Sequence, residues 1–335
     1  LKSLSFSCRS FGNGDGGLSG LVPAIGSLRL LETLNLSRNM IDNDGARVLA
    51  GGLANLHLLE ELNLERTSIG NRGAGALAAG LMHLRSLKGL YLSNNSIGDL
   101  GLQALADGIS NCSNLSRLDL SRNTSISVVG LRSLSALLQS DSCSLTSLHL
   151  RDIDFFSDDM AAALADGLRC NNKLKSLIFS PGQLTSAGWS ALSKLLCDTS
   201  SVNNTYLSNH TLVTIGDWSR DAPDDVKQLL ALTSRTDKPA AMLKILKSHP
   251  DFDVELLCQW QLKLLPLVVS WFERVGALVN TYKIFKKSAG AIQSRKLSTV
   301  YNFIRGMPLL KIEGYRSHNN AVMPAHSRKR KISQL

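Results

Sequence analysis

The chain has 335 residues, of which 44% are hydrophobic and 5% are aromatic, and it carries a formal net charge of +10. This composition is typical of a folded soluble protein, and the length exceeds that of one ordinary compact domain. No apolar run reaches the roughly 18 residues that a membrane-spanning helix needs, so no spanning segment is predicted. The chain begins at Leu1 without an initiator Met, and we expect further residues to precede it in the complete protein.

Charge is distributed unevenly along the chain. Residues 1–215 carry 17 basic and 17 acidic residues, whereas residues 216–335 carry 20 basic and 10 acidic residues. The whole net charge therefore belongs to the C-terminal part. Half of the excess lies in the last twenty residues, which contain no acid and hold Arg316, Arg328, Lys329, Arg330 and Lys331.

A leucine-rich unit recurs from the start of the chain with a spacing of 28 to 30 residues. Its eight copies begin at Leu1, Leu31, Leu59, Leu87, Leu115, Leu145, Leu174 and Val202. A fixed period in this range indicates a solenoid, in which each unit buries its apolar face only by stacking on its neighbours. We therefore predict an array of about eight repeats over residues 1–215.

The pattern within each repeat predicts a short strand followed by a helix. In residues 59–64 the leucines alternate with polar residues, so Leu62 and Leu64 are expected to point inward and Glu61, Asn63 and Glu65 outward. Residues 74–81 then show the apolar spacing of a helix with one buried face. The sequence thus predicts strand, turn, helix and turn in each unit.

A polar residue recurs at the position that follows the strand in several repeats. It holds Asn39, Asn95 and Asn123, whose side-chain amides are expected to bind the backbone of the turn. Residues 31–58, 59–86 and 87–114 resemble the ribonuclease-inhibitor-like subfamily of leucine-rich repeats, with the pattern LxxLxLxxNxIxxxGxxxLAxxL. The resemblance implies an α/β horseshoe, with a parallel sheet inside and helices outside. The same family includes immune receptors and the activating protein of the GTPase Ran.

The outward strand residues are the predicted partner-binding residues, because the strand face is the surface that the stack displays. We predict that this face binds a protein through Glu61, Asn63, Glu65, Tyr91, Arg117, Asp119, His149, Arg151 and Tyr206. The alternative is that these are ordinary solvated positions of the face. A third possibility, nucleic-acid binding, depends only on the basic C-terminal part.

Motifs for catalysis, cofactors and metals are missing from the sequence. Gly12, Gly14 and Gly17 match a dinucleotide-binding glycine pattern, but no ribose-binding acid follows at the required distance. Cys112, Cys143, Cys170 and Cys197 precede strands, and with Cys8 and Cys258 they lack zinc-like spacing, so we expect buried structural thiols. No catalytic, cofactor-binding or metal-binding residue is predicted, and we expect a non-enzyme.

Helical spacing replaces the repeat after Ile215. The segment from Asp221 to Asp225 resembles a helix start, residues 240–246 continue as helix, and further helices are predicted in residues 254–272 and 295–307. We expect residues 216–312 to form an all-α cap or domain, the alternative being a membrane-surface element around Trp260 and Trp271. The sequences LPLVVSWFERV and RKLSTVYNFIRGMP are similar to repeat families of algae such as diatoms, a resemblance that implies no chemistry.

Residues 313–335 are predicted to be a disordered basic tail. Arg328, Lys329, Arg330 and Lys331 form a compact cluster typical of a nuclear-import signal or a polyanion-binding arm, or simply of a solvated basic end. Asn-x-Ser/Thr sequences such as that at Asn35 would suit a secreted protein, but a glycan there would block the strand face. We therefore expect a cytoplasmic protein, with the nucleus as the alternative location.

Three functions remain in competition. The first is a non-enzymatic scaffold that binds a protein partner through the concave strand face. The second is a GTPase-activating protein like the Ran activator, although that protein carries an acidic region after its repeats and this chain is basic there. The third is the binding of nucleic acid or another polyanion through the basic C-terminal part.

Overall fold

The computed structural model describes residues 1–7, 16–153, 156–182, 184–216, 222–233 and 237–249. The chain divides into two compact units, Leu1–Pro250 and Asp251–Leu335. The second unit lies outside the described residues. So do the helices predicted in residues 254–272 and 295–307 and the basic tail, which stay predictions.

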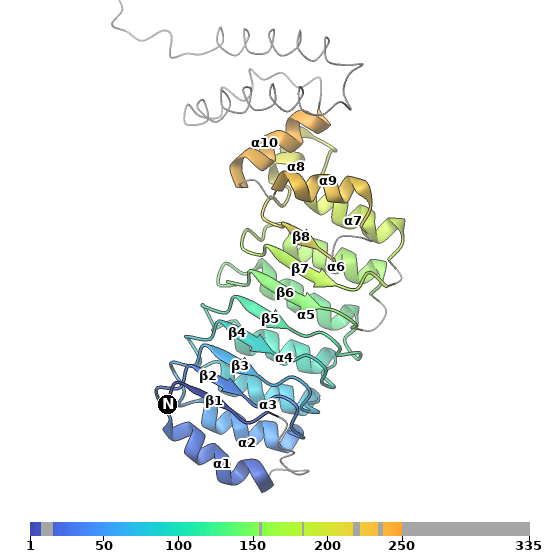
Figure 1. The fold of residues 1–335 in the computed structure, drawn as a ribbon. Helices are drawn as coiled ribbons and strands as arrows, with labels where there is room; N and C mark the ends of the chain where they lie inside the picture. The colour runs from blue at the N-terminus through green and yellow to red at the C-terminus, as the bar shows by residue number, and fades with distance from the viewer. Residues whose placement is uncertain (8–15, 154–155, 183, 217–221, 234–236, 250–335) are drawn as a thin grey trace, which may run out of the picture. The chain divides into compact units, whose positions relative to one another are not determined.

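Eight short strands form one parallel sheet, in which each strand pairs with its neighbours in sequence (Figure 1). They are β1 (Ser3–Ser5), β2 (Thr33–Asn35), β3 (Glu61–Asn63), β4 (Gly89–Tyr91), β5 (Arg117–Asp119), β6 (Ser147–Leu150), β7 (Ser176–Phe179) and β8 (Thr214–Ile215). The register aligns equivalent positions, so that Leu34, Leu62 and Leu90 are neighbours across three strands. The predicted solenoid with a parallel sheet is confirmed.

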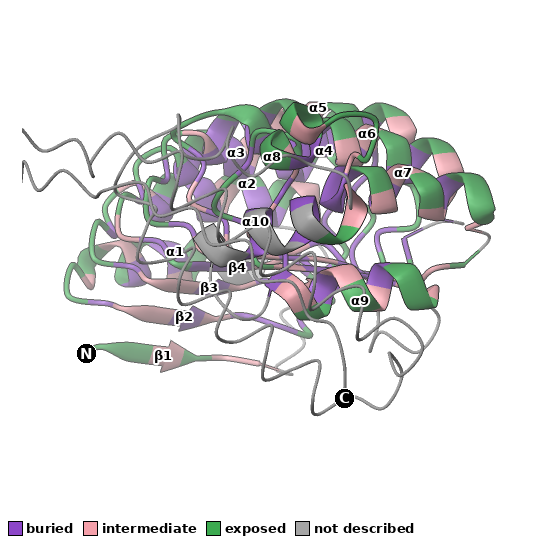
Figure 2. Cartoon of the chain, turned by 90° about the horizontal axis from the view of Figure 1, so that it is seen from above, coloured by how far each residue is buried: buried purple, intermediate pink, exposed green. Residues whose placement is uncertain are grey.

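A helix follows each of the first seven strands. These helices are α1 (Gly16–Ser27), α2 (Asn43–Leu53), α3 (Asn71–Leu81), α4 (Asp99–Ile109), α5 (Val128–Gln139), α6 (Asp158–Leu168) and α7 (Ser186–Leu196). They cover one side of the sheet, with buried residues toward the sheet and exposed residues outward (Figure 2). In α3 the buried residues include Ala74, Leu77, Ala78 and Leu81, which confirms the predicted helical spacing.

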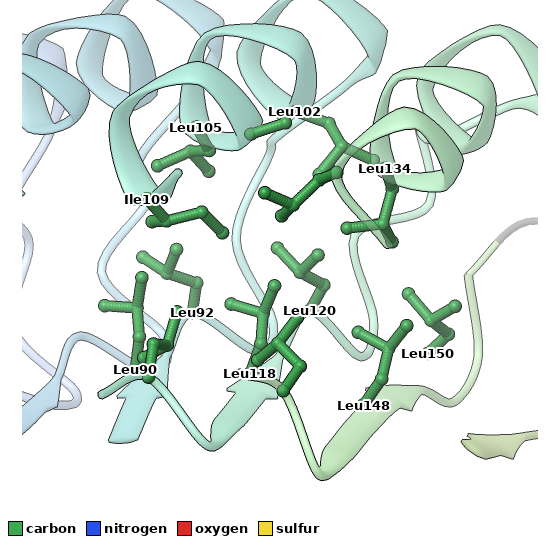
Figure 3. Close-up of a cluster of buried hydrophobic side chains, with 14 of the residues drawn as sticks. Leu90, Leu92, Leu102, Leu105, Ile109, Leu118, Leu120, Leu134, Leu148 and Leu150 are labelled. Atoms are coloured by element: carbon green, nitrogen blue, oxygen red, sulfur yellow. The ribbon is translucent and has the colours of Figure 1, made fainter. Parts of the chain in front are cut away.

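Leucines between the sheet and the helices form the core of the array. Leu118 and Leu120 point from the sheet toward Leu105 of α4 and Leu134 of α5 (Figure 3). All four side chains are at most 2% exposed. Burial of one leucine side chain contributes about 1.5–3 kcal/mol, and each repeat completes the burial of the next. The stability of each repeat therefore depends on its neighbours.

Buried asparagines satisfy the backbone where three of the strands turn toward their helices. Asn95 Nδ2 donates to the carbonyl oxygens of Leu64 (2.8 Å) and Leu92 (3.0 Å), and its Oδ1 accepts from the backbone N–H of Thr67 (3.1 Å) and Ile69 (2.9 Å). The side chain thus joins two successive repeats. The predicted backbone role of this position is confirmed, and equivalent bonds are made by Asn39 and Asn123.

A second ladder joins the helices at their N-termini. Asn71 begins α3, and its Oδ1 accepts from the backbone N–H of Gly98 (2.7 Å) and Gly101 (3.0 Å) at the start of α4. Each side chain of this kind therefore caps the helix of the next repeat and not its own. The same bonds are made by Asn43, Asp99 and Asp158. Sequence reasoning missed this ladder.

Small residues allow neighbouring helices to approach closely. A Cβ on Gly108 of α4 would lie 2.7 Å from the Cα of Ala78 in α3, a distance that real Cβ atoms do not show. Gly80 stands at the equivalent position of α3, where a Cβ would lie 2.7 Å from the Ala50 carbonyl oxygen. The absence of a side chain at these two positions therefore lets successive helices pack closely.

The prediction for the eighth repeat was wrong. Residues Val202–Leu207 form helix α8, and the last strand is β8, twelve residues later in the chain. Ser201 caps α8 by accepting from the backbone N–H of Asn204 (3.1 Å), and the Thr205 hydroxyl donates to Ser201 O (3.1 Å) within the helix. Leu212 and Ile215, each 0% exposed, supply the buried strand positions instead, and Ile215 pairs with Leu177.

In the part of the chain that the structure describes, helices α9 (Asp224–Thr233) and α10 (Asp237–Ser248) follow the sheet. Both confirm helices predicted from the sequence. Lys244 of α10 is 0% exposed, and its Nζ donates to the carbonyl oxygens of Leu196 (2.7 Å) and Asn209 (3.0 Å). Leu196 is the last residue of α7, where a cation is favourable to the helix dipole. Burial lowers the pKa of Lys244 to about 8.

The cysteines fit their predicted buried positions in three of the four described cases. Cys112, Cys143 and Cys197 are buried and unpaired, and burial raises the pKa of the Cys112 thiol to about 11. Such a thiol is a poor nucleophile. Cys170 is exposed, so the prediction of a buried thiol was wrong there. Cys8 and Cys258 lie outside the described residues.

Candidate functional site

The face of the sheet turned away from α1–α7 is the candidate site, and we call it the open sheet face. It consists of the outward residues of the eight strands and those that directly follow them. Glu61, Gly89 and Arg117 lie in one row, and Asn63, Tyr91, Asp119, His149 and Ile178 lie in the next. Eight strands at about 4.8 Å give a width of about 34 Å. The register thus brings most of the predicted partner-binding residues onto one surface.

Glu61, Tyr91 and Arg117 form the central cluster of the open sheet face. Glu61 and Arg117 are two strands apart, and Gly89 stands between them on β4. Because Gly89 has no side chain, the Glu61 carboxylate occupies the space where its Cβ would be. Arg117 Nη1 donates to the Tyr91 hydroxyl (3.3 Å), which also interacts with Glu61. Tyr91 thus lies beside a base from one neighbouring strand, and the acid on the other neighbouring strand affects its pKa.

The Tyr91 environment changes its acidity. Burial of the ring raises the pKa of Tyr91 above its ordinary value, and the Glu61 carboxylate raises it further, while Arg117 opposes both effects. Tyr91 is therefore a neutral hydrogen-bonding group at neutral pH. This side chain presents a partly buried aromatic ring in the middle of the face, the kind of group that anchors protein interfaces.

Asn63 and Asp119 hold the strand ends in addition to facing outward. Asn63 Oδ1 accepts from the backbone N–H of Glu65 (2.9 Å), and Asp119 Oδ1 accepts from that of Ser121 (2.9 Å). These are local side-chain turns that satisfy the backbone where the strand ends. Sequence reasoning assigned both residues to partner binding alone and missed this structural function, which the two-residue spacing could have indicated.

His149 and Arg151 lie on β6 and directly after it. His149 Nε2 is 3.0 Å from the hydroxyl of Ser147 on the same strand. The backbone N–H of Arg151 donates to the Ser121 hydroxyl (3.1 Å), and both Arg151 and His149 are half-buried. Ile178, the neighbour of His149 on β7, is buried at 9% exposure. The β6 to β7 end of the face is thus basic and apolar.

Tyr206 does not belong to the open sheet face, contrary to the prediction. It lies on α8 and is 50% exposed. The error followed from the wrong strand assignment for residues 202–207. His210, which follows α8, is half-buried, and its Nε2 is 3.0 Å from the Tyr206 carbonyl oxygen.

Other sites for chemistry are few in the described residues. The described part of the chain holds no group of three or more His, Cys, Asp or Glu residues arranged to bind a metal. Gly12 and Gly14 of the glycine pattern lie outside it. A cavity opens on the helix side, where Ala165, Asp166 and Arg169 of α6 and its end face Lys194 of α7 and Leu207 of α8. Within the described residues, no helix combines the length and apolarity needed to cross a bilayer.

Four segments of the array match a family model described as Leucine Rich repeat. The matched residues are 27–50, 55–78, 83–106 and 111–135. Each match contains one strand and most of the following helix, from β2 to α5. These segments are leucine-rich repeats. The strands and helices before and after them continue the same sheet and helix layer in the structure.

Several solved structures are similar to part of this chain. A TLR13–ssRNA13 complex is 21% identical with a TM-score of 0.36, and the match covers 58% of this chain and 31% of that chain. An internalin (inlF) from Listeria monocytogenes is 18% identical with a TM-score of 0.30, covering 58% of this chain and 59% of that one. Internalin C2 (inlC2) from Listeria monocytogenes is 18% identical with a TM-score of 0.32, covering 57% and 76%.

The chain spans less than two thirds of the length of the first two of these structures. A comparison with curated proteins found no match.

Proposed function

We propose that this chain is a non-enzymatic scaffold that binds a protein partner through the open sheet face. The observation that carries the proposal is the central cluster, in which Glu61, Tyr91 and Arg117 from three strands present an acid, an aromatic ring and a base side by side. A face about 34 Å wide is large enough for the footprint of an ordinary protein–protein interface. Leucine-rich repeats generally serve as such scaffolds.

Reversal of the charges on the open sheet face tests this proposal. A variant with Glu61→Lys, Glu65→Lys, Arg117→Glu and Arg151→Glu keeps the net charge, and we expect it to lose proteins that the intact chain captures from an extract. The matched control reverses two acids and two bases that are exposed on the helices, by Asp107→Lys, Asp166→Lys, Arg72→Glu and Arg132→Glu. Capture that survives reversal of the face, or is lost equally in the control, would refute the proposal.

We infer a second, separate candidate function for the basic C-terminal part, the binding of a polyanion. Its support is the excess of basic over acidic residues in residues 216–335, which includes Arg328, Lys329, Arg330 and Lys331. Binding of this kind weakens steeply as salt concentration rises, because bound counterions are released. Titration of the chain with single-stranded RNA at several salt concentrations tests it, and a flat salt dependence would exclude it.

We propose a cytoplasmic location, and the alternative is nuclear import through the same basic cluster. If import operates, deletion of residues 327–335 is expected to move a tagged protein from nucleus to cytoplasm. An unchanged distribution would remove the import function. We further propose that the array is of the ribonuclease-inhibitor-like subtype, because strands alternate with helices of about three turns at a spacing near 28 residues.

A further inference from the structure

Charged residues on the open sheet face are separated by strand. Glu61 lies on β3 and Glu65 two residues after its end, whereas Arg117 lies on β5 and Arg151 directly after β6. Between these acidic and basic columns, β4 and the residue that ends its outward row contribute no charge, only Gly89, Tyr91 and Ser93. The face therefore has an acidic side, a basic side and an aromatic residue between them.

The spacing of the two columns has a definite magnitude. The acidic column on β3 is two strand spacings from β5 and three from β6, which corresponds to about 10–14 Å. Within the acidic column, Glu61 and Glu65 are four residues apart, or about 13 Å along the strand. An α-helix with its side chains is about 10–12 Å across, and nine of its residues span about 13 Å. A single extended strand is too narrow to reach both columns.

Within the described residues, the contacts of Glu61, Glu65 and Arg117 include no strong ion pair. The Tyr91 hydroxyl lies between Glu61 and Arg117, and these two residues form no ion pair with each other in the described structure. Glu65 Oε1 is 3.6 Å from Arg66 Nε, an exposed pair that contributes little energy. Asp119, the acid on the basic side, directs Oδ1 to the backbone N–H of Ser121. The separation of charge therefore persists on the surface.

We propose that the open sheet face binds one α-helix of a partner protein, lying along β4 over Tyr91. One flank of this helix carries basic side chains that face Glu61 and Glu65, and the other carries acidic side chains that face Arg117 and Arg151. This inference depends on the proposed scaffold function and names the partner element that the face recognises. The complementarity of charge selects the helix, and the Tyr91 ring contacts its central stripe.

Two synthetic helical peptides of about 18 residues, five turns of helix, test the inference. Both contain the same residues with equal numbers of Lys and Glu. In the first peptide Lys and Glu occupy opposite flanks, and in the second they are intermixed on both. Because both peptides are neutral and share one composition, a difference in net charge cannot explain a preference between them. We expect the first to bind the full chain at least about threefold more tightly at low ionic strength, and equal binding would overturn the inference.

Exchange of the acidic and basic residues between the two columns provides a control. A variant that only disturbs the structure would not regain the preference between the peptides. Glu61→Lys with Glu65→Lys makes the whole face basic and is expected to abolish the preference between peptides. Addition of Arg117→Glu and Arg151→Glu exchanges the two columns and should restore it, since the helix then binds in the opposite direction. A folded fourfold variant, checked by circular dichroism, that shows no preference would contradict the inference.

A milder double variant leaves the contact between Glu61 and Gly89 unchanged. Glu65→Ala combined with Arg151→Ala is expected to reduce the preference, and an unchanged preference would overturn the inference even if the fourfold variant fails to fold. Failure of the proposed function is distinguishable from failure of this inference. If face reversal abolishes partner capture but both peptides bind equally, the scaffold function stands and the helix is excluded as its partner element.

Discussion

Asp99 binds Ser127 twice across the boundary between two repeats. Its Oδ1 accepts from the Ser127 backbone N–H (2.7 Å), and its Oδ2 accepts from the Ser127 hydroxyl (2.6 Å). The same Oδ1 accepts from the Gly130 backbone N–H (2.9 Å), so one carboxylate satisfies the N-terminus of α5 from the first residue of α4. This bond belongs to the stacking of repeats and not to the stability of a single helix.

Removal of this carboxylate is expected to destabilise the array. Asp99→Ala leaves two backbone N–H groups and one hydroxyl without their partner, so we expect the free energy of unfolding to fall by about 1–2 kcal/mol. Asp107→Ala, at an exposed acid of the same helix, is the control and should change it by less than about 0.5 kcal/mol. Urea unfolding of the three proteins decides the matter, and equal values for both variants would contradict the cap.

Two glycines in different helices of the array should respond in opposite ways to alanine. In α4, Gly108→Ala places a Cβ against Ala78, and we expect a loss of about 1–3 kcal/mol from overpacking. In α2, Gly51→Ala meets no atom within 4 Å, so the better helix propensity of alanine should stabilise by up to about 1 kcal/mol. Thermal unfolding measures both, and the same sign for the two changes would disprove the close-approach argument.

The stability of the chain should fall in acid partly through His210. Burial and the neighbouring Lys244 ammonium lower the pKa of His210 from 6.5 to about 4. Between these values the unfolded chain binds a proton that the folded chain does not. The contribution of His210 is therefore full above pH 6.5 and lost as the pH falls through about 4.

His210→Gln should lose less stability than the original chain between about pH 7 and about pH 4.5, because it has no proton to take up in that window. Urea unfolding at both pH values measures the difference. The control is His57→Gln, at an exposed histidine between α2 and β3. An identical loss of stability in the original chain and the His210 variant would refute the assignment.

The central cluster predicts opposite effects on the acidity of Tyr91. The Glu61 carboxylate raises the pKa of Tyr91 and Arg117 lowers it. Glu61→Gln should therefore lower this pKa toward its ordinary value, and Arg117→Met should raise it further. An NMR titration of the tyrosine ring carbons measures both variants. Asp107→Asn, far from the cluster on α4, is the control, and shifts of the same sign in the first two would exclude the bridging geometry.

Prediction from sequence succeeded where the repeat pattern alone decides the structure. The strands β2 to β7, the helices that follow them and the buried position of Asn95 could all be predicted, because the apolar residues of the repeat pattern are the ones that are buried there. It failed at residues 202–207, where Val202, Thr205 and Leu207 imitate the strand pattern, although Thr205 is polar and makes helical bonds. The spacing of Leu212 and Ile215, which carries the real strand, was the signal that could have corrected it.

The candidate site was only partly predictable for a related reason. Outward positions follow from strand alternation, so Glu61, Tyr91 and Arg117 could be placed on one face. Their mutual contact could not, because it depends on the exact register of three strands and on the space above Gly89. The inter-repeat caps of Asn71 and Asp99 were missed because each acts on a helix that begins about 28 residues later.

The sequence by itself determined the repeat, the alternation of strand and helix and the division of charge between residues 1–215 and 216–335. These properties are local, since each follows from spacing and composition within one unit or segment. Only the tertiary structure decided which side chains meet across repeats, such as Asp99 with Ser127 and Tyr91 with Arg117. Stacking aligns positions about 28 residues apart to within hydrogen-bonding distance, and no pattern within one repeat contains that information.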